Sequence, residues 1–180
     1  MRRTLTALAL AASAAAPALA QDWAVDAGAS SVGFEASAFD SPLTGEFQDF
    51  SAQIRLDPDN LAEARIEASV DTSSVVLSNS QYRSNLAGGD GLAVETHPQA
   101  RFVSDDVRAV DGGYEAAGEL TIKGETRALT LPFTLEIENG RAVAEGSFTI
   151  DRSNFGVGGG AWGDVGPSVT VSVHIEADAQ

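Results

Sequence analysis

Hydrophobic and polar residues alternate with a period of two over most of the chain beyond residue 20. Two clear runs cover residues 62–70 and 129–137, where apolar residues occupy every second position. Successive side chains of a strand point to opposite faces, so each run predicts a strand with one buried and one exposed face. Similar alternation is found at residues 31–38, 52–56, 114–122, 142–150 and 168–176. The pattern predicts an all-β domain of seven or eight amphipathic strands.

Short connections join most of these runs. Asn139 and Gly140 form a typical two-residue hairpin sequence, and residues 57–60, 111–113 and 123–125 have turn-forming compositions. Long strands joined by short turns favour antiparallel pairing. The sequence therefore predicts an antiparallel sheet rather than a parallel one.

The connection at residues 78–97 is the exception. We expect one or two short helices there, at residues 80–86 and 92–95, separated by a glycine-rich stretch. The strands themselves suit a sandwich or a closed barrel, and closure removes exposed sheet edges. An outer-membrane barrel is disfavoured, because such barrels carry aromatic girdles and this chain is only 7% aromatic.

The first 20 residues have the pattern of a secretory signal peptide. Arg2 and Arg3 precede an alanine-rich apolar stretch that ends in a small-x-small sequence at residues 18–20. The alternative is an N-terminal anchor helix, but the stretch is short for a membrane span. We expect a signal peptide at residues 1–20 and a mature domain at residues 21–180 that works outside the cytoplasm. Loss of the two arginines changes the net charge from −15 to −17.

The composition argues against several kinds of chemistry. The 26 Asp and Glu outnumber the 11 Lys and Arg, so binding to nucleic acid or to an anionic membrane is not expected. A chain with no Cys has no disulfide, thiolate metal site or Cys nucleophile. His97 and His174 are not spaced as metal ligands, and no G-x-S-x-G elbow is present. We therefore expect no metal site and no catalytic residues.

One glycine-rich segment formally matches a nucleotide-binding pattern. Residues 158–163 fit G-x-G-x-x-G, but that fingerprint must open a helix, and here it precedes a β-run. We interpret the segment as a loop in which Trp162 is an anchor or a lid.

Many residues on the apolar faces are small. Ala52, Ala64, Ala68, Ala144 and Gly146 stand where a filled core would carry larger side chains. A barrel of about eight strands has an interior that side chains just fill, or that holds one small ligand. Small inward residues therefore indicate an apolar cavity. The alternative is that they reflect a chain that is rich in alanine throughout.

Several motifs resemble the YceI-like family of extracytoplasmic lipid-binding proteins. The most distinctive is GELTIKGETR at residues 118–127, which is similar to the family pattern G-x-L-T-I-x-G-x-T-R/K. Residues 97–104 resemble Y-P-x-x-x-F-x-S, and residues 150–157 resemble I-x-R-x-D/N-F-G. Further similar segments occur in order at residues 23–34, 43–57, 70–75 and 82–86. The resemblance covers essentially all of residues 22–177.

The resemblance implies a periplasmic, eight-stranded antiparallel lipocalin-like barrel. It implies a long apolar tunnel for a polyisoprenoid, an isoprenoid quinone or a similar lipid, with no established catalysis and no cofactor apart from that lipid. The chain departs from the family pattern at Asn85, where histidine is common, and near Gly91 and Leu92, where an aromatic pair is common. Because this segment is expected to cover the barrel mouth, the identity of the lipid stays open.

Candidate lipid contacts follow from the inward positions and from the resemblance. For the tail we predict Phe34, Ala64, Ile66, Ala68, Tyr114, Leu120, Leu131, Phe133, Phe148 and Val171. For the headgroup at the mouth we predict Arg83, Asn85, Arg152, Asn154 and Trp162. Arg152 is favoured for a phosphate or a quinone oxygen, because cations are few in this acidic chain. The alternatives are that the tail residues are ordinary core and that Arg152 pairs with a nearby Asp.

We therefore expect a periplasmic protein, not an enzyme, that transports or stores an isoprenoid lipid and contacts the membrane only transiently. A homodimer would accommodate a tail that outgrows one barrel. Two alternatives belong to other classes. An enzyme acting on a lipophilic substrate needs a polar cluster deep inside the barrel, and a stress-related structural protein needs a filled core.

Overall fold

The computed structural model describes residues 21–39, 41–159 and 162–180. The predicted signal peptide lies outside the described residues, and so does part of the glycine-rich motif. The strands are β1 (Asp22–Val25), β2 (Ser31–Ala38), β3 (Ser41–Phe47), β4 (Phe50–Arg55), β5 (Arg65–Asp71), β6 (Val75–Leu77), β7 (Gln99–Val110), β8 (Gly113–Ile122), β9 (Glu125–Glu138), β10 (Arg141–Asp151) and β11 (Val165–Ala179). The connections contain the helix α1 (Ser80–Ala87) and the 3-10 turns η1 (Leu61–Glu63), η2 (Thr72–Ser74) and η3 (Arg152–Phe155).

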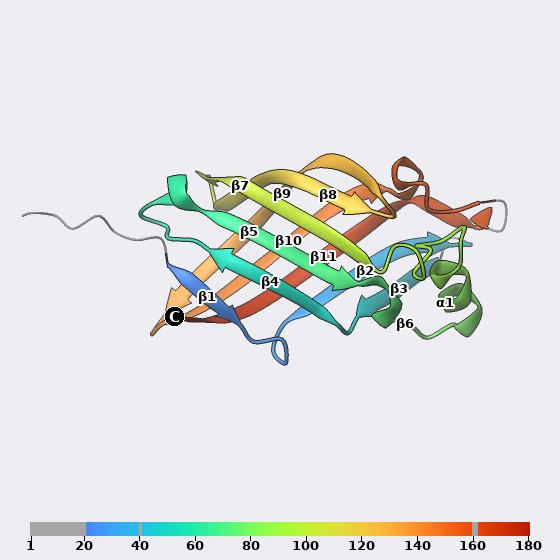
Figure 1. The fold of residues 1–180 in the computed structure, drawn as a ribbon, viewed down its shortest axis with the longest axis horizontal. Coiled ribbons are helices and arrows are strands. Elements are labelled where there is room, and N and C mark those ends of the chain that lie inside the picture. Colours follow the sequence, from blue (N-terminus) through green and yellow to red (C-terminus); the bar gives the residue numbers. More distant parts are fainter. Residues whose placement is uncertain (1–20, 40, 160–161) are drawn as a thin grey trace, which may run out of the picture.

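The strands form one antiparallel sheet that closes on itself (Figure 1). β1 pairs with β4 through Trp23 and Ile54, and with β11 through Trp23 and Ala179. Some long strands are interrupted, because β1 and β2 both pair with β11, and β3 and β4 pair with β2 and β1. β5 and β6 likewise pair with β4 and β3. Counting each interrupted pair once gives an eight-stranded barrel, so the predicted fold class is confirmed.

The 78–97 connection contains one helix rather than two. α1 begins after Asn79, whose side-chain oxygen accepts hydrogen bonds from the backbone N–H groups of Gln81 and Tyr82. Residues 92–95 form turns, and Ala93 has a φ of 51°, which a right-handed helix does not contain. None of the helices in the described part of the chain is both long and apolar enough to cross a membrane.

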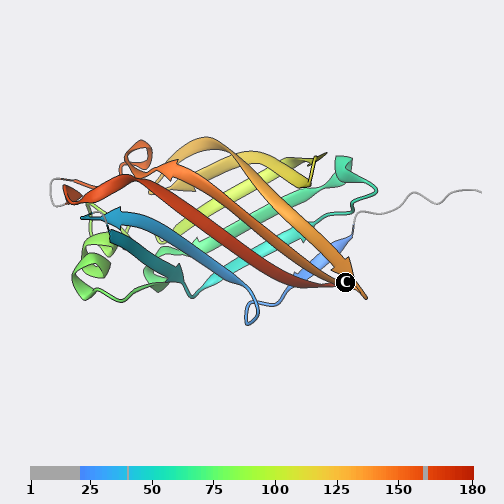
Figure 2. The ribbon, with the colours of Figure 1, turned by 180° about the vertical axis from the view of Figure 1, so that it is seen from behind.

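The barrel is elongated and its two ends differ (Figures 1 and 2). α1, β6, η3 and the β2–β3 turn gather at one end, which we call the helix end. β1 begins and β11 finishes at the opposite end, which we call the Trp23 end. There Trp23, Leu56 and Ala177 are buried, and Trp23 Nε1 donates a hydrogen bond to the Leu56 carbonyl at 2.8 Å. Side chains therefore fill the Trp23 end.

Hydrogen bonds to backbone carbonyls hold the connections in place at the helix end. Lys123, in the β8–β9 turn, donates from Nζ to the carbonyl oxygens of Gly89 and Gly156, both at 2.7 Å. Thr72 Oγ1 donates to the His97 carbonyl at 2.8 Å. The single lysine of the chain thereby joins the segment after α1 to the segment after η3.

An arginine at the Trp23 end predicts how stability depends on pH. The Arg141 guanidinium lies 2.7 Å from Glu176 Oε2, 3.1 Å from Asp178 Oδ1 and 3.3 Å from Asp26 Oδ2. Hydrogen bonds from Arg141 first, and then from His174, hold the pKa of Glu176 below its ordinary value of 4.5. A carboxyl whose pKa is lowered by folding stabilises the fold fully above its unfolded pKa, and this contribution is lost as the pH falls through the folded pKa.

We therefore expect Arg141→Gln to lower the thermal unfolding midpoint at pH 7 and to lessen the further loss on acidification to pH 3. Melting curves at both pH values measure this. Arg127→Gln is the control, because Arg127 makes an exposed pair with Glu125 on the same strand. An Arg141→Gln protein that loses as much stability between the two pH values as the parent would contradict the assignment.

Candidate functional site

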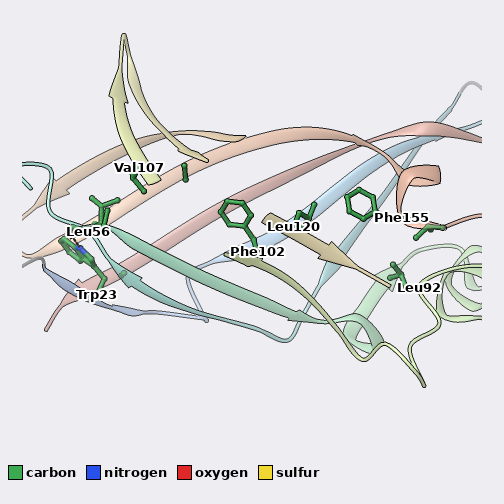
Figure 3. Packing of buried hydrophobic residues seen from close by; sticks show 12 residues of the cluster. Trp23, Leu56, Leu92, Phe102, Val107, Leu120 and Phe155 are labelled. Carbon is green, nitrogen blue, oxygen red and sulfur yellow. Dashed lines mark hydrogen bonds between the residues drawn. The ribbon is translucent and has the colours of Figure 1, made fainter. Parts of the chain in front are cut away.

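Two apolar cavities lie inside the barrel, one after the other. The larger, which we call the inner cavity, has a volume of about 220 Å³ and is lined by inward residues of nearly every strand. The smaller, which we call the helix-end cavity, has a volume of about 110 Å³ and lies beneath α1 and η3. Figure 3 shows buried residues one after another along the length of the barrel, from Trp23 and Leu56 through Phe102 and Leu120 to Phe155 and Leu92. The interior is therefore hollow between two packed ends.

Small side chains produce the inner cavity. Ala52 of β4 and Ala68 of β5 are paired neighbours on adjacent strands, and both line the cavity wall. On the opposite wall Ala144 and Gly146 follow each other along the inward face of β10. A Cβ on Gly146 would lie only 2.9 Å from the Pro132 carbonyl oxygen, so this position has little room for a side chain. Four of the five small inward positions named from the sequence therefore lie on the wall of the inner cavity, and Ala64 does not.

A pair of phenylalanines stands where the two cavities meet. Phe47 lines both cavities, and Phe34 lines the helix-end cavity. Their ring centroids are 5.6 Å apart, with an interplanar angle of 44°. The Phe34 ring occupies the space that a side chain on Gly45 would need. Leu92, Ile122 and Val171 also line both cavities, so the residues shared by the two cavities are apolar.

The predicted tail residues fall mostly on the cavity walls. The inner cavity is lined by Ile66, Ala68, Leu120, Leu131, Phe133, Phe148 and Val171. Phe34 lies on the helix-end cavity instead. Ala64 is buried in the core but is not on either wall, and Tyr114 stacks on Phe133 with a centroid distance of 5.4 Å. Contact with a lipid stays a prediction for all of these residues.

The predicted headgroup residues do not form one cluster. Arg152 and Trp162 both line the helix-end cavity. Arg83 is exposed on α1, and Asn154 is exposed in η3. The side-chain oxygen of Asn85 accepts a hydrogen bond from Gln81 Nε2 at 3.0 Å within α1. Of the five, only Arg152 and Trp162 lie where a ligand in the cavities would reach them.

Arg152 is held by backbone carbonyls. Its guanidinium donates to the carbonyl oxygens of Val165 (2.7 Å), Val157 (2.8 Å), Gly166 (3.0 Å) and Trp162 (3.4 Å). It also lies over the Trp162 ring, 5.3 Å from the centroid. Its hydrogen-bond partners in the described residues are thus carbonyls rather than a carboxylate. Arg152 ties Val157 and Trp162 to the start of β11, and it brings a positive charge to the end of an apolar cavity.

Asp151 is a neighbouring charge whose environment is local. Hydrogen bonds from the Ser153 side chain and backbone hold the pKa of Asp151 below its ordinary value, and the Arg152 charge contributes less. The carboxylate caps η3 by accepting the Ser153 N–H at 2.9 Å. Asp151 therefore serves the turn that places Arg152 and Phe155.

The backbone ladder between β9 and β10 covers only part of the length of these two strands. The β9–β10 ladder ends at Gly146 and Phe133, although both strands continue toward the helix end. The carbonyl of Pro132 is on the β10 side, and a residue in a strand directs its nitrogen and carbonyl to the same neighbour. Because proline has no N–H, it cannot continue this ladder. η3 contacts both strands near the gap, and its Phe155 is 3% exposed.

Neither of the two histidines lines the inner cavity or the helix-end cavity. His174 lies on the outside of β11, 3.4 Å from Glu145 Oε1 and 3.3 Å from Glu176 Oε1. His97 lies beside Gly124 in the β8–β9 turn. Within the described ranges, no group of three or more His, Asp or Glu residues could hold a metal ion. The linings of the two cavities are mainly apolar, which suits retention of an apolar molecule.

The chain is similar in sequence to known proteins. A family profile described as "YceI-like domain" matches residues 23–177. A UPF0312 protein of Pseudomonas aeruginosa is 31% identical over 122 residues, which cover 64% of this chain and 63% of that relative. UPF0312 proteins of Yersinia are 34% identical over 89 residues, or 49% of this chain and 46% of theirs. The chain thus aligns with less than two thirds of the length of these relatives.

Solved structures share the fold. Burkholderia cenocepacia BcnA has a TM-score of 0.81 and 33% identity over 85% of this chain and 99% of its own. A polyisoprenoid-binding domain from Saccharophagus degradans has a TM-score of 0.68 and 15% identity, covering 90% of this chain and 99% of its own. The Campylobacter jejuni YceI protein has a TM-score of 0.63 and 20% identity over 76% of this chain and 84% of its own. At these last two identities the likeness is one of fold.

Proposed function

The chain belongs to the YceI-like family, and we propose that it binds a polyisoprenoid or isoprenoid-quinone lipid and transports or stores it outside the cytoplasm. The observation that carries this proposal is the succession of two apolar cavities along the barrel axis. A long, thin, apolar chain matches that shape better than a compact ligand. The polyisoprenoid-binding domain among the structural neighbours supports the same ligand class.

The physical chemistry of such a ligand supports a carrier. Burying about ten methylene groups at ~0.8 kcal/mol each contributes roughly 8 kcal/mol before ordering costs. That corresponds to about micromolar affinity. An isoprenoid tail is therefore held tightly enough to cross water and weakly enough to be released.

The two cavities have different chemistry, and this gives the proposed ligand an orientation. The inner cavity ends at the packed Trp23 end, whereas Arg152 and Trp162 line the helix-end cavity. We place the tail in the inner cavity and the polar headgroup near Arg152. Because Arg152 already donates its hydrogen bonds to backbone carbonyls, it would attract a headgroup mainly through its positive charge. Trp162 lies beside it.

Export through the signal sequence at residues 1–20 is part of the proposal. It rests on the two arginines, the alanine-rich stretch and the small-x-small sequence before Gln21. A domain without Cys needs no disulfide in an oxidising compartment, so its stability rests on the closed sheet and its core.

Native mass spectrometry of the full-length gene product, purified from the cell envelope without detergent, tests the proposal. We expect a chain that begins at Gln21 and carries one noncovalent adduct, and an organic extract from which an isoprenoid lipid is identified. The solvent-extracted protein is the control and should show the polypeptide mass alone. A phospholipid in the extract would contradict the lipid class. A protein that is lipid-free as purified and binds no added isoprenoid would contradict the function.

A further inference from the structure

The tip of the β2–β3 hairpin carries an exposed aromatic ring in an unfavourable backbone conformation. Phe39 is 69% exposed, the largest exposure among the large hydrophobic side chains in the described part of the chain. Its φ is 48°, a left-handed value that is rare for a bulky residue. A residue that is both exposed and strained contributes little to folding. The combination indicates a contact made with something outside the chain.

The surrounding structure forces this ring outward. Ala38 pairs with Ser41 across the hairpin and with Val165 of β11, so both sides of the tip are fixed. The Phe39 backbone N–H donates to the Asp164 carbonyl at 3.0 Å. Ala38 itself is buried and packs in a cluster with Trp162 and Val165. The tip is therefore anchored to the same segment that forms the end of the helix-end cavity.

The position of Phe39 is specific to one end of the barrel. Trp162 and Val165, directly behind the tip, line the helix-end cavity, and Tyr82 and Leu86 of α1 line it from another side. Of the three other exposed large hydrophobic residues in the described part of the chain, Val76 (48% exposed) lies in β6 at the helix end. Val110 and Ile137 are each 40% exposed and lie near hairpin turns away from it. An apolar contact through Phe39 brings the helix end, and not the Trp23 end, to the contacted surface.

We propose that Phe39 is a membrane anchor that inserts into the interfacial region of a zwitterionic bilayer, which has no net charge, while the helix-end cavity faces the lipid. The inference deepens the proposed function, because it names the surface through which cargo is exchanged. Phe is one of the apolar side chains that peripheral proteins bury at the boundary between lipid headgroups and acyl chains, and a single ring on a hairpin tip gives a contact that is readily reversed. The net charge, −15 for the whole sequence and −17 without residues 1–20, opposes contact with anionic lipid.

Flotation with phosphatidylcholine vesicles tests the proposal with a matched pair of variants. Asn tolerates a positive φ, so Phe39→Asn removes the ring without adding strain, and its melting temperature should equal or exceed that of the parent. We expect the vesicle-bound fraction to fall about tenfold for Phe39→Asn and to be unchanged for Val110→Asn. Equal vesicle binding by the parent and Phe39→Asn, or an equal fall in both variants, would overturn the proposal.

The absence of Cys from the chain permits a second, independent readout. An environment-sensitive fluorophore on Phe39→Cys should shift to the blue with phosphatidylcholine vesicles, whereas the same fluorophore on Val110→Cys should not. A dimer that Phe39→Asn dissolves on size-exclusion chromatography would instead show that the ring meets a second copy, and it would overturn the membrane assignment.

The outcome separates this proposal from the proposed function. Lipid content measured by native mass spectrometry should be the same in Phe39→Asn and the parent, because Phe39 lines neither cavity. The rate of lipid transfer between vesicles should fall with vesicle binding. A chain that binds vesicles through Phe39 but carries no lipid would refute the ligand and leave the anchor standing.

Discussion

Ala144→Phe is expected to weaken lipid binding about a hundredfold while the barrel stays folded. Ala144 faces the inner cavity from β10, between Leu135 of β9 and Ile175 of β11. A phenyl ring at this position occupies space that the tail would fill. Displacing about four methylene groups at ~0.8 kcal/mol each loses roughly 3 kcal/mol of binding free energy, which corresponds to about two orders of magnitude in Kd.

Titration of the lipid-free protein with a fluorescent farnesyl probe measures this effect. Ala128→Phe is the matched control, since Ala128 is exposed on the outer face of β9 and the substitution is the same. We expect the control to bind as the parent does. Thermal melts of both variants show whether the ring is accommodated, because a ring placed in a cavity costs less than one placed in a filled core. Equal affinities of Ala144→Phe and Ala128→Phe would refute the assignment of the inner cavity to the tail.

Arg152→Lys should have the largest effect on stability among the polar residues of the site. The guanidinium satisfies four carbonyl oxygens between residues 157 and 166, and an ammonium group cannot reach all of them. Part-buried carbonyls that lose charged donors make the free energy of unfolding fall by about 2–4 kcal/mol. This loss should be present in the lipid-free protein, because it does not depend on a headgroup.

Chemical denaturation of the lipid-free variants tests this prediction. Arg83→Lys is the control with the same substitution, because Arg83 is exposed on α1, and a change within about 0.5 kcal/mol is expected there. If Arg152→Lys unfolds at the parent's midpoint but binds lipid more weakly, Arg152 acts on the headgroup and not on the fold. That result would contradict the structural role assigned to its hydrogen bonds.

The period-two pattern was enough to predict most of the barrel, and its failure at β7 has a physical cause. Ala100, Phe102 and Ser104 of this strand are buried, as alternation requires. The register then shifts between Ser104 and Asp106, and the next buried residue is Val107. A bulge adds one residue and moves the following side chains to the other face, so no continuous alternation exists in the sequence. The interruptions between β1 and β2 and between β3 and β4 were not predicted either. They become visible only in the strand pairing, where β1 and β2 share β11 as their partner.

The cavity walls were more predictable than the cavity end. Inward positions within strands follow from alternation, which is why Ile66, Ala68 and Phe148 could be identified from sequence. Leu92 and Phe155 lie in turns that have no period, and only the fold brings them over the helix-end cavity. Similarly, the charge of Arg152 was visible in the sequence, but its four carbonyl partners come from a loop and a strand up to 14 residues away.

A crystal structure of the protein carrying its own lipid tests the central claim most directly. We expect continuous ligand density from the inner cavity, past the Phe34–Phe47 pair, to the headgroup beside Arg152 and Trp162 at the helix end. Lipid density on the outside of the barrel, or a headgroup at the Trp23 end with the helix-end cavity empty, would contradict it.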